Sequence, residues 1–199
     1  FYSQADLDAY LERLELARAR DHRRLGTQLD LFHFDEFSPG SPYWHPKGMV
    51  IWNELEDLRR RENARRGYVE VKTPVIFDKT LWEISGHWEK FRENMFLIPD
   101  EERVFGLKPM NCPGHMRIFG DRMRSYRELP LRMAEAGTLH RNEPSGTLHG
   151  LLRVRHVTQD DGHTYCLPDQ IEDEVGLCLE HAFYLYGLLG LDMRVELSL

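Results

Sequence analysis

The segment from residue 140 to residue 163, HRNEPSGTLHGLLRVRHVTQDDGH, constrains the fold more than any other part of the chain. It gathers three arginines, four histidines, two aspartates, one glutamate and one glutamine. Its second half has the pattern of a strand, on which alternate side chains share a face. One face then carries the odd-numbered residues, a cation, an amide, a carboxylate and an imidazole: Arg153, Gln159, Asp161 and His163. Such a face predicts the lining of a polar pocket rather than a core.

A break in the middle of this segment predicts that the chain folds back on itself. Pro144, Ser145 and Gly146 are turn residues, so residues 139–141 can return as a neighbouring antiparallel strand. From the pattern alone, a charged hairpin at the edge of a sheet remains an alternative.

Helix and strand signals elsewhere indicate a mixed architecture. Apolar residues at helical spacing predict an amphipathic helix over residues 5–25. Pro46 is expected to begin a long helix that Gly67 ends, and Asp78 to cap a short one. We also expect a loop or short strand at 32–43, a strand at 68–71, a hairpin of 95–98 with 103–107, and helices starting near Pro113 and Pro168. Strands bunched between flanking helices predict an α+β fold on an antiparallel β-sheet.

Composition narrows the possible functions. The chain has 199 residues, 41% of them hydrophobic, which is enough for one domain with a core. A net charge of -7 argues against a nucleic-acid coat protein or a polybasic membrane binder. Arginines at 59–61, 65 and 66 could contact a phosphate backbone, although a solvated helix face is the simpler interpretation.

Cysteine content and the lack of a long apolar run bear on the compartment. Cys112, Cys166 and Cys178 are odd in number and widely spaced, which favours free thiols in a reducing compartment. The sequence contains no run of eighteen apolar residues and no secretory signal, so we expect a cytoplasmic protein that does not enter a membrane. It begins with Phe1 rather than Met, and we expect it to be a piece of a longer protein.

Three blocks of sequence resemble the threonyl-tRNA synthetases, a family of class II aminoacyl-tRNA synthetases. Residues 67–76, GYVEVKTPVI, are similar to the first class II signature, and residues 110–115, MNCPGH, to the cysteine block of this family. Residues 132–163 are similar to the second signature. The resemblance implies a partial class II catalytic domain over 1–199, with a leading helix and linker at 1–31 and the two signatures at 32–199. It implies an antiparallel sheet flanked by helices, truncated before the third signature.

The resemblance also implies a reaction. Such an enzyme activates L-threonine with ATP, accompanied by Mg²⁺, and transfers the threonyl group to tRNA(Thr). Arg141 would be the catalytic residue, because its guanidinium can neutralise the threonine carboxylate and the α-phosphate of ATP together. Glu143 would accept from the adenine amino group, and Arg153 would contact a phosphate.

Cys112 and His163 are the candidate metal ligands. A thiolate and an imidazole suit Zn²⁺, but fifty-one positions separate them, so spacing alone favours an ordinary core cysteine. The resemblance implies one zinc ion per subunit, with a third histidine ligand beyond residue 199. It also implies that Asp161 accepts from the threonine hydroxyl and that Gln159 contacts the amino-acid carboxylate or the α-phosphate. Valine, which lacks the hydroxyl, would be rejected.

Several other residues near these motifs have simpler interpretations. His87, His115 and His149 are more often packing or hydrogen-bonding histidines than ligands. His156 stands at an even position and is expected to face away from the pocket. Gly162, where relatives typically have alanine, is a small change beside a metal ligand.

The resemblance leaves three functions to distinguish. The first is a piece of a threonine–tRNA ligase that forms a homodimer through the 46–76 region and is weakly active or inactive in isolation. The second is an adenylate-forming paralogue that loads an amino acid onto another acceptor. The third is a non-catalytic regulatory or dimerising relative, which the presence of all seven candidate site residues disfavours.

Overall fold

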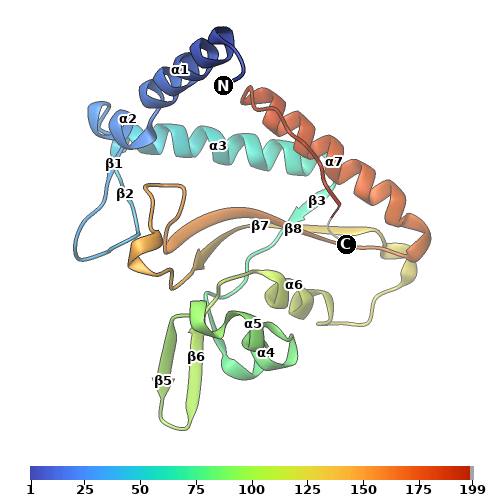
Figure 1. Ribbon diagram of the computed structural model, residues 1–199. Helices are drawn as coiled ribbons and strands as arrows, with labels where there is room; N and C mark the ends of the chain where they lie inside the picture. The colour runs from blue at the N-terminus through green and yellow to red at the C-terminus, as the bar shows by residue number, and fades with distance from the viewer. Residues whose placement is uncertain (198–199) are drawn as a thin grey trace.

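Two long antiparallel strands, β7 (Leu131–His140) and β8 (His156–Tyr165), organise the computed structural model, which describes residues 1–197 (Figure 1). Their register pairs Leu131 with Tyr165 at one end and His140 with His156 at the other. The predicted return of the chain as an antiparallel strand is confirmed. The third strand of this sheet, β3 (Tyr68–Glu70), runs parallel to β7, so the central sheet is mixed.

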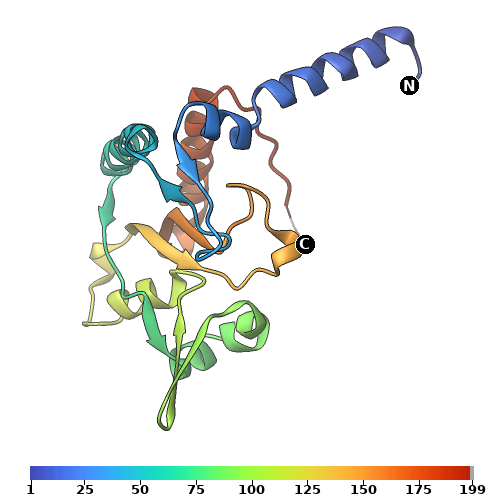
Figure 2. The same ribbon diagram turned by 90° about the vertical axis from the view of Figure 1, so that its left-hand side faces the viewer.

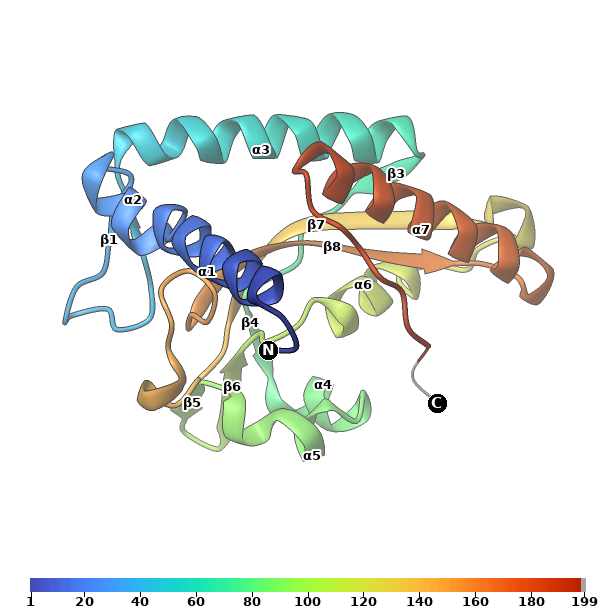
Figure 3. The same ribbon diagram turned by 45° about the horizontal axis from the view of Figure 1, so that its top comes forward.

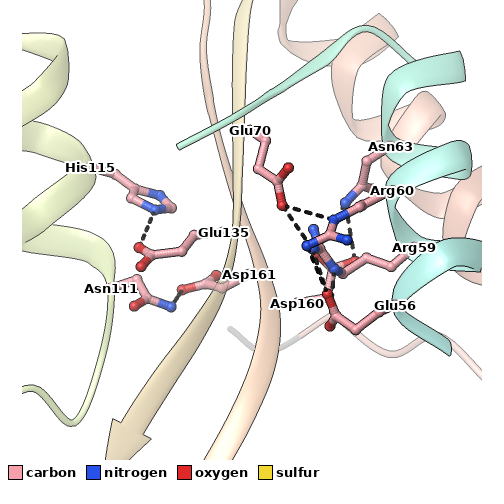
Figure 4. Close-up of polar contacts among 10 residues, drawn as sticks. All are labelled: Glu56, Arg59, Arg60, Asn63, Glu70, Asn111, His115, Glu135, Asp160 and Asp161. Atoms are coloured by element: carbon pink, nitrogen blue, oxygen red, sulfur yellow. Dashed lines mark hydrogen bonds and ion pairs between the residues drawn. The ribbon is translucent and has the colours of Figure 1, made fainter. Parts of the chain in front are cut away.

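Helices cover both faces of the β7–β8 pair. α3 (Pro46–Arg65) and α7 (Ile171–Leu188) lie on one face, and α6 (Cys112–Phe119) lies on the other (Figures 1 and 4). Asn63 of α3 donates to Asp160, whereas Asn111, just before α6, donates to Asp161. Successive strand residues point to opposite faces, so these two neighbouring aspartates bind opposite layers.

The ends of the helices follow their sequence signals. Pro46 is in the first turn of α3, and Gly67 adopts a left-handed φ of 76° directly after the helix, where glycine is least strained. The Asp78 side chain accepts from the backbone N–H of Thr80 and caps α4 (Lys79–Ile84). Pro168 opens a short 3₁₀ turn, Pro168–Gln170, that leads into α7.

A second, smaller sheet lies below α6. Its strands are β4 (Ile76–Asp78), β5 (Leu97–Asp100) and β6 (Arg103–Leu107), all antiparallel in the order β4-β6-β5. The predicted hairpin is confirmed, with its first strand starting two residues later than expected. α4 and α5 (His87–Phe91) pack beside this sheet, and Trp82 of α4 is fully buried. Short 3₁₀ turns at Arg92–Asn94, Tyr126–Glu128 and Ser145–Thr147 join the remaining elements.

The first predicted helix is wrong in its extent. The structure has two helices, α1 (Gln4–Ala19) and α2 (His22–Gln28), because Asp21 accepts from the backbone N–H of Arg23 and starts a new helix. No residue of α1 is buried within residues 1–197, and Figure 2 shows this helix extending away from the remaining elements. A two-stranded ribbon of β1 (Phe32–His33) and β2 (Tyr43–Trp44) follows α2.

Candidate active site

The odd-numbered face of β8 carries Gln159, Asp161 and His163, as the alternation predicts. Opposite them on β7 lie Gly137, Glu135 and Met133. Arg153 is not part of this strand face, which corrects the prediction: β8 begins at His156, and Arg153 forms an isolated bridge with His149 in the preceding turn. The strand is shorter because residues 149–152 form a hydrogen-bonded turn before it.

Cys112, Asp161 and His163 form a cluster, which we call the candidate metal cluster. One ligand atom from each residue lies within 4.8 Å of the others. Cys112 is the first residue of α6, and the other two side chains come from β8, so helix and sheet meet here. All three side chains are partly buried.

The donor set of this cluster fits zinc. Thiolate, imidazole and carboxylate are all common zinc ligands. Burial and then the nearby Asp161 raise the pKa of the Cys112 thiol, and burial lowers the pKa of His163. A bound dication reverses the first of these effects, because a coordinating thiol is deprotonated. The cluster includes Asp161 beside the two predicted ligands, so this carboxylate is itself close enough to reach a metal bound there.

A network of buried polar side chains contacts the candidate metal cluster through His163. It consists of Thr73, Lys108, His115 and Glu135, and we call it the Glu135 network. Glu135 accepts from the Lys108 ammonium at 2.9 Å and from the Thr73 backbone N–H at 3.0 Å. His115 lies 3.2 Å from Glu135 (Figure 4). Its other ring nitrogen lies 2.8 Å from His163. Burial alone would raise the pKa of Glu135, but hydrogen bonds from His115, Thr73 and Lys108 outweigh it and hold this pKa at about 2.

Asn111 holds the side chain of Asp161 in the candidate metal cluster. Its side chain is fully buried and donates to Asp161 at 3.1 Å. Gly137 makes this possible, because a Cβ atom there would lie 2.4 Å from the amide oxygen of Asn111. Within residues 1–197, that amide oxygen has no hydrogen-bond partner.

The segment that joins β7 to β8 carries three of the predicted residues, Arg141, Glu143 and Arg153. Glu143 is nearly buried and accepts from Nε and Nη2 of Arg153 at 3.1 and 2.9 Å. Arg141 donates from Nε to the carbonyl of Pro109 at 3.3 Å, and Gln159 is exposed. The structure therefore joins Glu143 to Arg153 directly, and Arg141 to the loop before α6.

The residues assigned simpler roles have contacts that match them. His115 is a buried hydrogen-bonding residue, and His87 bonds to the Ser85 hydroxyl at 2.9 Å. His156 faces the opposite side from the candidate metal cluster and stacks on His140, with ring centroids 5.1 Å apart. Gly162 also faces that opposite side, where an added Cβ would meet the ring of Tyr68 at 3.1 Å.

Sequence reasoning missed Thr73, Lys108 and Glu135. Lysine and glutamate are rarely buried unless they are paired, and these two are separated by 27 positions. The only signal in the sequence was a lysine just before the MNCPGH block and a glutamate within a strand. That these two charges pair depends on tertiary contacts.

Comparison with known proteins gives the family. The model of the tRNA synthetase class II core domain (G, H, P, S and T) matches residues 94–198, more than half of the chain. The chain belongs to this class II tRNA synthetase core family. Within this synthetase core, the matched region contains Glu135 and the whole candidate metal cluster.

Individual relatives are similar over most of this synthetase core. A threonine–tRNA ligase from Polynucleobacter necessarius is 61% identical over 195 residues, which are 98% of this chain and 30% of that protein. A crystal structure described as the RNA binding domain of threonyl-tRNA synthetase from Cryptosporidium parvum matches with a TM-score of 0.83 at 52% identity, over 86% of this chain and 43% of that one. Prolyl-tRNA synthetase from Giardia lamblia, solved with prolyl-adenylate, matches with a TM-score of 0.76 at 19% identity over 85% of this chain and 36% of its own, and shares the fold.

Proposed function

We propose that these residues form part of the catalytic core of a threonine–tRNA ligase. The enzyme would join L-threonine to ATP, release pyrophosphate, and transfer the threonyl group from the adenylate to tRNA(Thr). The observation that carries this proposal is the candidate metal cluster, in which Cys112 of α6 meets Asp161 and His163 of β8 with their ligand atoms within 4.8 Å of one another. The chain spans 30% of its Polynucleobacter relative, and the rest of that length is expected to complete the site.

Activation of threonine needs charge stabilisation rather than a protein nucleophile. The substrate carboxylate attacks the α-phosphate, and the two anions repel each other. Arg141 is proposed to hold both groups, because a guanidinium offers a planar fork of donors. Its anchor to the Pro109 carbonyl would restrict its rotation.

Glu143 and Arg153 are proposed to bind ATP, which carries Mg²⁺. Glu143 would accept from the adenine amino group, and its two hydrogen bonds from Arg153 hold its carboxylate in place. Arg153 is half exposed, so its remaining donors can reach a phosphate.

Cys112 and His163 are proposed to hold zinc, with a third ligand outside this chain. A bound zinc ion would supply Lewis-acid coordination of the threonine amino and hydroxyl groups. Asp161 would accept from the hydroxyl, and Gln159 would donate to the carboxylate or the α-phosphate. Valine leaves Asp161 without its donor, whereas serine satisfies it, so valine is the better rejected of the two.

Dimerisation is proposed to use the 46–76 region. The outer side of α3 exposes the apolar residues Val50, Ile51 and Leu55, and Val69 of β3 is also exposed. Figure 3 shows α3 at the edge of the structure, with none of the described elements beyond it. A homodimer would cover this side. Sedimentation should show a dimer that Leu55→Asp weakens, and a monomer in both proteins would contradict this part of the proposal.

The proposed compartment is the cytoplasm, where free thiols persist. Cys112, Cys166 and Cys178 are all free. Within residues 1–197, none of the helices has the length and apolar character needed to cross a membrane.

The test is amino-acid-dependent exchange of pyrophosphate into ATP. It compares this chain with a protein of its relatives' full length that contains it, with threonine, serine and valine in parallel. We expect exchange with threonine and little with valine in the longer protein, and weak or no exchange in the isolated chain. Arg141→Ala should reduce exchange by about 10²–10³-fold, and Arg127→Ala, at an exposed arginine, should leave it unchanged.

The outcomes of this test separate the three functions. Exchange without charging of tRNA(Thr) would favour an adenylate-forming paralogue. No exchange in the folded, zinc-loaded longer protein would refute the enzyme and leave a regulatory relative.

A further inference from the structure

A continuous line of hydrogen bonds runs from a buried ion pair to the candidate metal cluster. Lys108 Nζ donates to Glu135 at 2.9 Å, Glu135 contacts Nε2 of His115 at 3.2 Å, and Nδ1 of His115 contacts Nδ1 of His163 at 2.8 Å. His115 is fully buried, and the side chains of Lys108 and Glu135 are 1% and 4% exposed. Figure 4 shows His115 between α6 and the strand pair, pointing at Glu135.

The first contact has only one possible direction. Glu135 is a carboxylate whose oxygens can only accept, and the Lys108 ammonium balances its charge. Its Oε1 accepts from Lys108 and from the Thr73 N–H, and its Oε2 accepts from the Thr73 hydroxyl. The contact at Oε2 therefore requires that His115 carry its proton on Nε2.

The second contact then follows from the first. A neutral His115 with a proton on Nε2 has a bare lone pair on Nδ1. The partner at 2.8 Å, Nδ1 of His163, must supply the proton of that hydrogen bond. His163 is left with a lone pair on Nε2, the ring nitrogen that can bind a metal.

We propose that Lys108, Glu135 and His115 act as positioning residues that hold His163 in the tautomer and orientation needed to bind a metal through Nε2. This inference rests on the proposed zinc site. Partners behind the ligands commonly fix the tautomer of a metal-binding histidine in this way. Here the partner of His163 is a second histidine, His115. The tautomer of His115 is in turn fixed by Glu135, whose charge Lys108 balances.

The geometry makes one substitution especially informative. In Glu135→Gln, the amide oxygen replaces Oε1, because Lys108 and the Thr73 N–H both need an acceptor there. The amide NH₂ then replaces Oε2 and donates to Nε2 of His115. His115 must move its proton to Nδ1 and donate to His163, which becomes protonated on Nε2 and loses its ligand lone pair.

The test combines two measurements. The first is nitrogen NMR of the metal-free protein, which reports the protonated ring nitrogen of His163. We expect Nδ1–H in the unmodified protein and Nε2–H in Glu135→Gln. The second is titration with Co²⁺, a spectroscopic probe of thiolate coordination, on a protein of the relatives' full length that contains this chain, and the signal should be lost in Cys112→Ser. Glu135→Gln should weaken Co²⁺ binding by about 10–100-fold.

A matched control comes from α7, which packs against the same sheet. Glu174 is also a buried carboxylate, paired with Arg132 of β7. Glu174→Gln should disturb folding to a similar extent and leave both the His163 tautomer and Co²⁺ binding unchanged. Near-ultraviolet circular dichroism checks that each variant is folded.

The results separate this inference from the proposed function. An Nε2–H tautomer in the unmodified protein overturns the positioning role, whatever the metal does. Tight Co²⁺ binding that is equal in Glu135→Gln overturns it as well and leaves the zinc site intact. If the NMR shows the expected tautomers but the protein does not bind Co²⁺, the proposed metal site is refuted. The positioning role of Lys108, Glu135 and His115 towards a metal is then refuted as well.

Discussion

Replacement of Lys108 by methionine is expected to destabilise the protein strongly. The change removes the balancing charge of Glu135, whose side chain is only 4% exposed. The network lowers the pKa of Glu135 from 4.5 to about 2. At about 1.4 kcal/mol for each pKa unit, the network as a whole favours the ionised form by about 3 kcal/mol. Breaking a buried pair by removing one partner costs about 3–5 kcal/mol, so we expect Lys108→Met to lose about 3 kcal/mol at pH 7.

The effect of Lys108→Met on stability should also depend on pH. Because its pKa is lowered by folding, Glu135 contributes stability that is present above pH 4.5 and lost as the pH falls towards 2. Lys108→Met removes this contribution, so its loss of stability should be full at pH 7 and shrink as the pH falls from 4.5 towards 2, and the less stable variant should unfold at a higher pH. Urea denaturation at pH 7 and at steps from pH 6 to 2 measures both effects.

A control and a rescue make the reasoning refutable. Lys90→Met, at an exposed lysine, should change the free energy of unfolding by less than about 0.5 kcal/mol. The double variant Lys108→Met with Glu135→Leu should recover part of the loss, because an apolar pair can replace a buried ion pair. If Lys108→Met lowers the free energy of unfolding by less than about 1 kcal/mol and does not move the acid transition, the pair of Lys108 and Glu135 is not buried as described.

Three further predictions concern glycines and histidines. Gly137→Ala should cost about 1–3 kcal/mol in urea denaturation, because its Cβ would overlap the side chain of the fully buried Asn111. Gly176→Ala should instead stabilise by about 0.5–1 kcal/mol, since it lies in α7 with nothing within 4 Å of the added Cβ, and a loss there would contradict the helix assignment. Burial lowers the pKa of both stacked histidines, His140 and His156, and the charge of His156 lowers that of His140 further. The unfolded chain therefore binds more protons, and stability should fall as the pH drops below 6.5, a dependence that His156→Phe should reduce.

Local signals were sufficient where one residue decides the structure. Pro46, Gly67 and Asp78 set helix ends through backbone geometry and capping, and the helices begin and end where these residues predict. The alternation of β8 likewise predicted that Asp161 and His163 share a face, since a strand has a period of two. The expected extent of the first helix was wrong because Asp21 can cap a helix, and this local hydrogen bond outweighs an apolar pattern with nothing to cover it.

Non-local pairing was beyond the reach of these signals. The direction of β3 relative to β7 depends on the path of the chain through 60 intervening residues, and no residue of the strand encodes it. Lys108 had the appearance of an ordinary surface lysine, because burial of a lysine depends on a partner that only the fold supplies. The candidate metal cluster could be anticipated from resemblance, whereas the residues that orient it required the structure.

The buried carboxylate of Glu135 explains why three distant blocks of sequence form a single site. Thr73, near the end of the first signature, supplies a backbone and a hydroxyl donor. Lys108, just before the cysteine block, and His115, its last residue, supply the others. Gly114 allows α6 to approach, since a Cβ there would lie 2.7 Å from the Thr73 side chain. A buried carboxylate that lost one of these donors would be left partly unsatisfied, at a cost of about 1–3 kcal/mol or more. The requirement to satisfy one carboxylate therefore fixes the distance between the sheet and α6, and this distance brings Cys112 to the ligands on β8.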